Sequence, residues 1–201
     1  MQILLRMKHI KNKMKLLLAI VIIFSFQSWT KADDIKEFEI EGISIGDSAL
    51  NFFSEKEIID NLSISKTLKG SNFKRACFNN FGNLYDRICV EFKIGNEKTI
   101  HGLQGQIRYK KVNNPICKKK LKEIDKEFSI VFNNLERKEW GLLKLHVGKD
   151  NSYLPITYSF PDNSRSQIGC YYFTQQNSTI LKVLLYDHEF RKIISKKTEK
   201  K

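Results

Sequence analysis

Residues 37–62 read EFEIEGISIGDSALNFFSEKEIIDNL, and this stretch combines a strand, a glycine break and two helix starts. Apolar and acidic side chains alternate from Glu37 to Glu41, which is the period-two pattern of a strand with one face on a core and one in water. Gly42 then shifts the phase of the alternation, and this predicts a bulge or bend where a residue without Cβ costs least. The stretch therefore predicts a domain that mixes strands and helices from its beginning.

Two helical turns follow the bend. Asp47 is placed to accept hydrogen bonds from the free amides of a first turn. Ser54 and Glu57 match the capping box, in which each side chain satisfies a backbone amide of the other residue. The apolar residues of the two turns are Ala49, Leu50, Phe53, Ile58, Ile59 and Leu62. Their spacing predicts two short helical segments that bury one side.

The same part of the chain carries a family resemblance. Residues 27–35 read QSWTKADDI, residues 38–48 read FEIEGISIGDS, and residues 186–190 read YDHEF. Together these motifs resemble a group of small exported proteins of AT-rich marine alphaproteobacteria, a group with no assigned activity. The resemblance covers most of the chain after residue 32. It implies export and architecture, and it carries over no catalytic residue.

A second likeness concerns the order strand, Gly-Ile-Ser-x-Gly-Asp-Ser, helix. This order is similar to the repeat units of small envelope modules of the outer-membrane assembly lipoprotein and β-lactamase-inhibitor type. It implies a location in the cell envelope and identifies no site residue.

The first 32 residues have the pattern of a secretory signal. Lysines precede an apolar run over residues 16–26, and Thr30-Lys31-Ala32 offers small residues before a cleavage point. The rival interpretation is a membrane anchor, but this run is much shorter than the roughly 20 residues needed to cross a bilayer. We therefore expect cleavage after Ala32, a periplasmic location and no transmembrane span in the cleaved protein. Translation could begin at Met1 or at Met14.

The positive charge of the chain lies mainly at its two ends. Of the formal net charge of +13, residues 33–190 account for +2, because the first 32 residues hold six bases and no acid, and residues 191–201 hold six bases and one acid. The distribution does not indicate a nucleic-acid-binding face. We expect one domain over residues 33–190, a disordered basic tail over 191–201, and a monomer.

Four cysteines lie after the predicted signal, an even number in an exported chain. They allow three disulfide connectivities, of which we favour Cys77 with Cys89 as a local link and Cys117 with Cys170 as a link between the long helix and the sheet. A metal site is the alternative, but no Cys-x-x-Cys pair or paired histidine spacing supports it. We predict two disulfides and no metal site.

The rest of the chain alternates strands with one long helix. Residues 87–94 predict a strand whose Cys89 points away from the main apolar face, and residues 62–81 predict a loop. Asn114 and Pro115 predict the start of the helix. The predicted later strands are 143–147, 156–160, 168–172 and 181–185, and Asp187 is placed to cap a short final helix. We predict a single α+β domain, an antiparallel sheet with one long helix and one short helical segment packed on one face.

The candidates for chemistry are histidines. His101, His146 and His188 are the histidines after the predicted signal, and none lies in a recognised catalytic motif. His146 with Asp150, or His188 with Asp187, could form a base and its orienting carboxylate. The sequence favours a non-catalytic periplasmic binding or interaction module, with an envelope protein or a small ligand as partner and no cofactor. The alternative is a small periplasmic hydrolase that uses His146 or His188.

Aromatic residues between 153 and 173 could form an exposed patch on the predicted strands. Since side chains alternate along a strand, we expect instead that alternate aromatics are core and the others half-buried.

Overall fold

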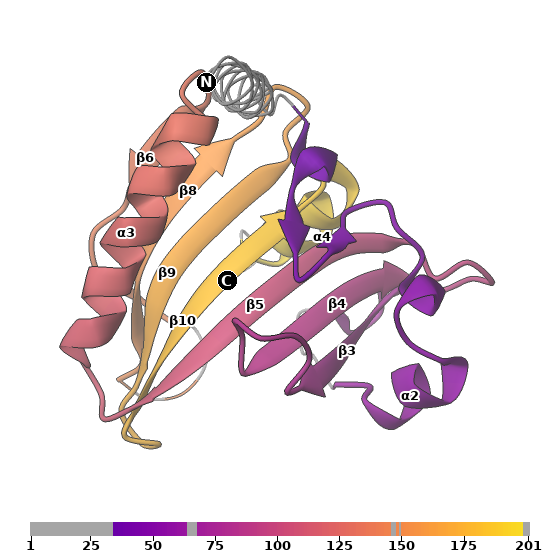
Figure 1. The fold of residues 1–201 in the computed structure, drawn as a ribbon, viewed down its shortest axis with the longest axis horizontal. Helices are drawn as coiled ribbons and strands as arrows, with labels where there is room; N and C mark the ends of the chain where they lie inside the picture. The colour runs from indigo at the N-terminus through magenta and orange to yellow at the C-terminus, as the bar shows by residue number, and fades with distance from the viewer. Residues whose placement is uncertain (1–33, 64–67, 146–147, 149, 199–201) are drawn as a thin grey trace, which may run out of the picture. The chain divides into compact units, whose positions relative to one another are not determined.

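An eight-stranded antiparallel sheet forms the centre of the domain (Figure 1). The computed structural model describes residues 34–63, 68–145, 148 and 150–198, so the predicted signal and His146 lie outside the described residues. The strands, in spatial order, are β3 (Phe73–Asn79), β4 (Arg87–Lys93), β5 (Ile100–Lys110), β10 (Ser178–Tyr186), β9 (Arg165–Phe173), β8 (Ser152–Ser159) and β6 (Glu136–Glu139), with β7 (Leu143–Lys144) pairing with β8. The predicted α+β class is confirmed.

The N-terminal stretch begins with the short helix η1 (Ile35–Glu37) and a two-stranded hairpin of β1 (Glu39–Ile40) and β2 (Ile43–Ser44). Glu41 and Gly42 form its turn with φ angles of 54° and 77°. Two consecutive positive φ angles fit a type I′ turn, whose twist matches that of the flanking strands. The predicted phase shift at Gly42 is therefore a chain reversal.

Two short helices continue this segment, η2 (Ala49–Asn51) and α2 (Glu55–Asp60). The capping box at Ser54 is confirmed, because the Glu57 carboxylate accepts from the Ser54 amide at 2.8 Å and the Ser54 hydroxyl accepts from the Glu57 amide at 3.3 Å. Asp47 does not cap η2 as predicted. Its carboxylate accepts instead from the Ser44 amide at 2.8 Å, and Ser48 caps the helix.

One face of the sheet, called the core face below, holds the main apolar cluster. The long helix α3 (Pro115–Val131) packs over β9 and β10 on this face, and Asn114 caps it as predicted by accepting from the Ile116 amide at 2.9 Å (Figure 1). Phe132, directly after α3, contacts the rings of Phe38 and Tyr158 in the core. The N-terminal segment joins the same cluster through Phe53 and Ile58. The long helix α3 and the short helical segment near the N-terminus therefore pack on the same face of the sheet, as predicted.

The opposite face, called the back face, carries a helix of its own. This helix, α4 (His188–Thr198), packs Phe190 against Phe73 of β3 in a separate small cluster. Asp187 caps it as predicted, because its carboxylate accepts from the Phe190 amide at 2.8 Å. The helix continues through Thr198 where a disordered tail was predicted from residue 191, since Phe190, Ile193 and Ile194 give it a side to bury.

Both predicted disulfides are confirmed. Cys77 and Cys89 face each other on neighbouring strands β3 and β4, on the back face as predicted for Cys89. The bond between Cys117 and Cys170 ties the first turn of α3 to β9 with a Cα–Cα distance of 6.1 Å. The predicted loop over 62–81 was wrong, because it contains β3.

Candidate ligand-binding groove

The structure does not bring the predicted histidine pairs together as a catalytic site. Asp187 approaches His101, with 2.6 Å between its carboxylate and Nδ1 of the ring, and this pair links α4 to β5. His188 is exposed at the start of α4. His146, the proposed partner of Asp150, lies outside the described residues. Asp187 thus orients His101 and not its neighbour His188, so in the described part of the chain the predicted His188–Asp187 pair is not formed.

The aromatic residues considered for a surface patch are mostly internal. Tyr158 is fully buried on the core face, and Tyr171 is buried on the back face, where its ring stacks on Tyr153 with centroids 5.1 Å apart. Phe173 is half-buried. The predicted alternation between the two faces is confirmed, but Tyr171 on the back face is buried where a half-buried side chain was predicted.

A groove opens on the back face over β6, β8 and β9. It consists of two adjoining cavities of about 450 and 170 Å³, which share Trp140, Thr157 and Arg165 as walls. Lys138 and Glu136 of β6 line one side of the larger cavity, and its remaining walls include the β8–β9 turn and α4. The size of the larger cavity lies within the range of small-molecule sites. We call this feature the Trp140 groove.

Strand register places the groove side chains. Lys138 pairs with Thr157 between β6 and β8, and Thr157 pairs with Gln167 between β8 and β9, so the three side chains share one row on the back face. Arg165 lies two residues from Gln167 and therefore projects from the same face. The groove is thus built mainly on strands, which hold side chains more firmly than loops do.

Trp140 is the fixed aromatic wall. Its indole nitrogen donates to the hydroxyl of buried Thr157 at 3.0 Å, and its amide donates to the Pro155 carbonyl at 3.2 Å. The ammonium group of Lys138 lies 3.7 Å from the centre of a ring of the indole, within the range of a cation–π interaction. Trp140 nevertheless stays 40% exposed, so part of its surface remains accessible to a ligand.

The groove has an excess of positive charge. Lys138, Arg165 and Arg191 face it, against the single carboxylate of Glu136 among its lining residues. Arg191 donates to the Asn163 carbonyl at 2.7 Å, which fixes its guanidinium beside the β8–β9 turn. This charge balance favours an anion.

Arg165 brings unmet hydrogen-bonding capacity to the wall of the groove. Its Nε atom is buried and has no hydrogen-bond partner among the described residues. Burial lowers the pKa of the guanidinium, Arg191 lowers it further, and Glu136 acts in the opposite direction. A buried donor without an acceptor is unfavourable, and an anionic ligand in the groove would supply one.

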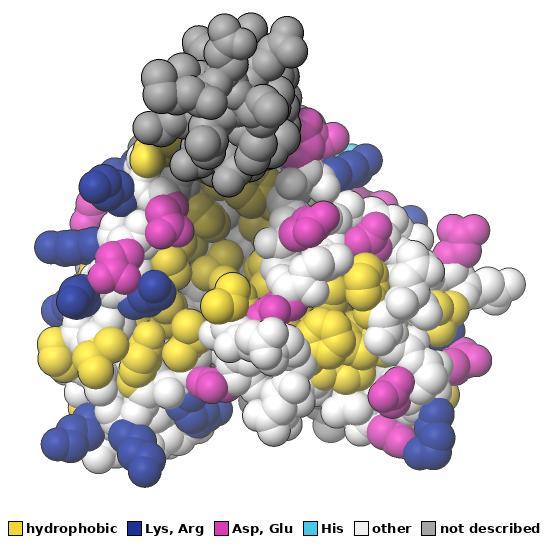
Figure 2. Space-filling view, in the orientation of Figure 1, with side chains coloured by type: hydrophobic (Ala, Val, Ile, Leu, Met, Phe, Trp, Pro, Cys, Tyr) yellow, Lys and Arg dark blue, Asp and Glu magenta, His cyan; other side chains and the backbone are white. Residues whose placement is uncertain are grey.

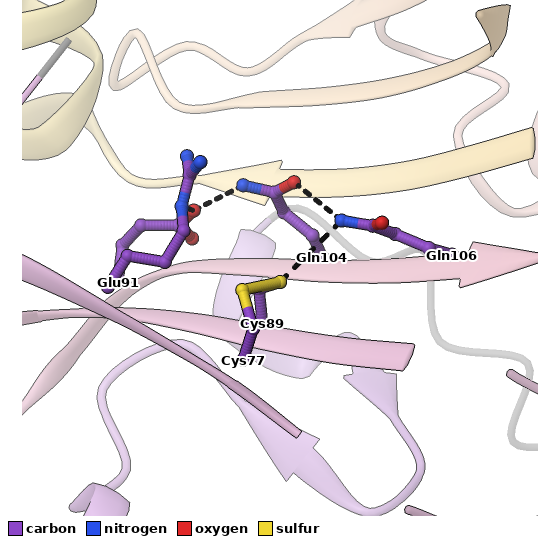
Figure 3. Close-up of a disulfide and its surroundings, with 6 residues drawn as sticks. Cys77, Cys89, Glu91, Gln104 and Gln106 are labelled. Atoms are coloured by element: carbon purple, nitrogen blue, oxygen red, sulfur yellow. Dashed lines mark hydrogen bonds and ion pairs between the residues drawn. A yellow bond between two sulfur atoms is a disulfide. The ribbon is translucent and has the colours of Figure 1, made fainter. Parts of the chain in front are cut away.

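A second polar feature of the back face is buried beside the Cys77–Cys89 disulfide (Figure 3). The fully buried carboxylate of Glu91 accepts from Arg75 Nε at 2.6 Å and from the Gln104 amide, and Gln106 donates to Gln104 Oε1 at 3.4 Å. Figure 3 shows these side chains in a row above β5, ending with Gln106 against the sulfur of Cys89. Since its members mainly bind one another, we treat this row as structural.

The side of the molecule that carries α3 presents charges of both signs among the described residues. Figure 2 shows basic and acidic side chains mixed along α3, with hydrophobic side chains visible between α3 and the N-terminal segment. The Trp140 groove has no continuous signature in the sequence, because its residues come mainly from β6, β8, β9 and α4. The one local signal was a tryptophan in the otherwise polar run ERKEWG, residues 136–141.

Comparison with protein families, curated proteins and solved structures finds no match for this chain. Among the described residues, no group of three or more His, Cys, Asp or Glu side chains is placed to hold a metal ion. Within the same residues, no helix has both the length and the apolar character needed to cross a membrane.

Proposed function

We propose that the protein is a non-catalytic binding module of the periplasm, and that it holds a small anionic ligand in the Trp140 groove. The observation that carries this proposal is the buried, unpaired Nε of Arg165 in the wall of a groove with excess positive charge. The two disulfides support an oxidising compartment, which agrees with the signal predicted over residues 1–32.

The side chains of the groove define the chemical class of the ligand. A guanidinium binds carboxylate and phosphate oxygens through paired hydrogen bonds, so Arg165 and Arg191 would take the anionic end. Trp140 and Leu135 offer apolar surface in the same cavity. The ligand we infer is a carboxylate or phosphate attached to a ring or a short apolar group.

Replacing Arg165 by Gln is expected to weaken the binding of phenyl phosphate, a probe with both features, by about tenfold to a hundredfold. This range follows from about 1.5–3 kcal/mol for hydrogen bonds to a charged group. Binding can be followed by the fluorescence of Trp140, with Trp29 replaced by Phe in any preparation that retains residue 29, because the sequence has two tryptophans.

The matched control is Lys74→Gln, which removes one positive charge from an exposed position outside the groove. It should leave the affinity within about twofold, since a distant exposed charge is largely screened. The proposal fails if phenyl phosphate does not change Trp140 fluorescence, or if Arg165→Gln and the wild type bind it equally well.

Export has its own test. We expect protein recovered from the periplasm to have the intact mass of a chain that begins at Asp33 and carries two disulfides. The Lys-rich start, the short apolar run and the Thr-Lys-Ala site motivate this expectation. A mature mass that still includes residues 1–32 would refute it.

A further inference from the structure

A second group of cations lies on the back face over β4, β5 and β10. Arg87 pairs with Gln106 across β4 and β5, and Gln106 pairs with Lys182 across β5 and β10. Opposed residues of neighbouring strands have Cβ atoms about 4.5–5.5 Å apart, so Arg87, Gln106 and Lys182 form one continuous row. Arg108 lies two residues beyond Gln106 on β5 and therefore belongs to the same face.

Among the described residues, no carboxylate forms an ion pair with Arg87, Arg108 or Lys182. Within the same part of the chain, none of the three side chains makes a hydrogen bond, and Nε of Arg87 is buried without a partner. Two carboxylates of the same strands and their connections bind other groups. Glu91 accepts from Arg75, and Asp86 accepts from the backbone amide of Arg108 at 2.6 Å.

Lys182 is half-buried, and it lies beside a position without a side chain. Its partner on β9 is Gly169, and its ammonium group lies 4.7 Å from the centre of the Tyr171 ring. Burial lowers the pKa of Lys182 to about 8, Arg75, Arg87 and Arg108 lower it too, and Glu91 opposes them. Arg87 and Arg108 therefore lie close enough to Lys182 to disfavour its charged form.

We propose that Arg87, Arg108 and Lys182 form a binding site for a doubly charged oxyanion, of the phosphate monoester type, separate from the Trp140 groove. Two guanidinium groups and an ammonium supply the fork and point-charge donors that phosphate oxygens accept. The site goes beyond the function proposed above, because none of its three residues lines the Trp140 groove.

Pyridoxal 5′-phosphate is a suitable probe, since its phosphate would be held by the two arginines while its aldehyde reaches Lys182. The amine and the aldehyde condense to an imine with loss of water, and borohydride reduces the imine to a stable amine that peptide mapping locates. The quantity to measure is the ratio of labelling at Lys182 to labelling at Lys144, which is exposed. We expect this ratio to be at least about tenfold higher with pyridoxal 5′-phosphate than with pyridoxal, because charge-assisted hydrogen bonds to the phosphate contribute about 1.5–3 kcal/mol.

Protection distinguishes the source of the phosphate. If the site takes soluble phosphates, inorganic phosphate should reduce the selective labelling of Lys182. If it takes a lipid headgroup, phosphatidic acid vesicles should reduce this labelling and phosphatidylcholine vesicles should not. Protection by neither would overturn the proposal, as would equal selectivity for the two aldehydes.

Arg108→Gln is the decisive variant, because Arg108 is exposed and its loss should not disturb folding. It should reduce the excess labelling by pyridoxal 5′-phosphate while leaving the labelling by pyridoxal unchanged. Unchanged selectivity in Arg108→Gln and also in Arg87→Gln would overturn the proposal. Arg165→Gln should have no effect on Lys182 labelling, so failure of this site and failure of the Trp140 groove give different results.

Discussion

Replacing Glu91 by Leu is expected to lower the free energy of unfolding by about 3–5 kcal/mol, the usual effect of breaking a buried ion pair by removing one partner. The Glu91 side chain is 0% exposed and accepts from Arg75 and Gln104, so its loss leaves the Arg75 guanidinium without its carboxylate. Chemical denaturation of the purified variant would measure the change.

The matched control is the double variant Arg75→Met with Glu91→Leu, which removes both charges. It should recover most of the stability lost in Glu91→Leu, because a buried ion pair replaced by apolar groups of similar volume is often close to neutral. Equal stabilities for the single and the double variant would show that the pair is not coupled.

The Glu91 carboxyl also gives a pH dependence. Burial raises its pKa above the ordinary value of 4.5, and Arg75 and Gln104 oppose the rise. Between the pKa of Glu91 in the unfolded chain and its higher pKa in the folded protein, the folded state binds more protons. The stability contributed by protonated Glu91 is therefore fully present below pH 4.5 and is lost as pH rises through the folded-state pKa. As pH increases between these two pKa values, the free energy of unfolding of the wild type should fall relative to that of Glu91→Gln. A rise in the wild-type value relative to the variant would contradict the assignment.

Removing the Cys117–Cys170 disulfide is expected to destabilise the protein by about 4 kcal/mol in the chain-entropy model. The bond closes a loop with a sequence separation of 53 residues, and both cysteines are fully buried. The double variant Cys117→Ala with Cys170→Ala should show this loss in denaturant unfolding under non-reducing conditions.

The Cys77–Cys89 disulfide is the internal control, since its sequence separation is 12 residues. Its removal should cost about 1 kcal/mol less than removal of the longer link, because a shorter loop restricts the unfolded chain less. A larger loss for the Cys77–Cys89 pair would contradict the entropic account of both bonds.

Local signals predicted the parts of the fold that depend on neighbouring residues. The Ser54 capping box, the Asn114 cap and the Asp187 cap are each formed within a few residues, and all three are present. The disulfide pairing could be anticipated for a related reason, because Cys77 and Cys89 are near in sequence and the other two cysteines then pair with each other.

Elements defined by distant partners could not be predicted. β3 is apolar toward both faces, with Phe73 and Cys77 on one and Ala76 and Phe78 on the other, so it lacks a period-two pattern. All four residues of β6 are exposed, and the strand exists because it pairs with β8. The Trp140 groove depends on this pairing, which explains why the sequence did not reveal it.

The sequence of β6 also bears on self-association. β6 ends the sheet, and an unpaired outer strand is a template on which a second molecule can add its own strand. If two copies of Glu136-Arg137-Lys138-Glu139 paired antiparallel along their full length, each Glu136 would face the other copy's Glu139, and each Arg137 would face a Lys138. Like charges directly opposite each other destabilise a strand pair. The order of charges along β6 therefore opposes edge-to-edge pairing of two sheets, which would lead to dimers or fibrils.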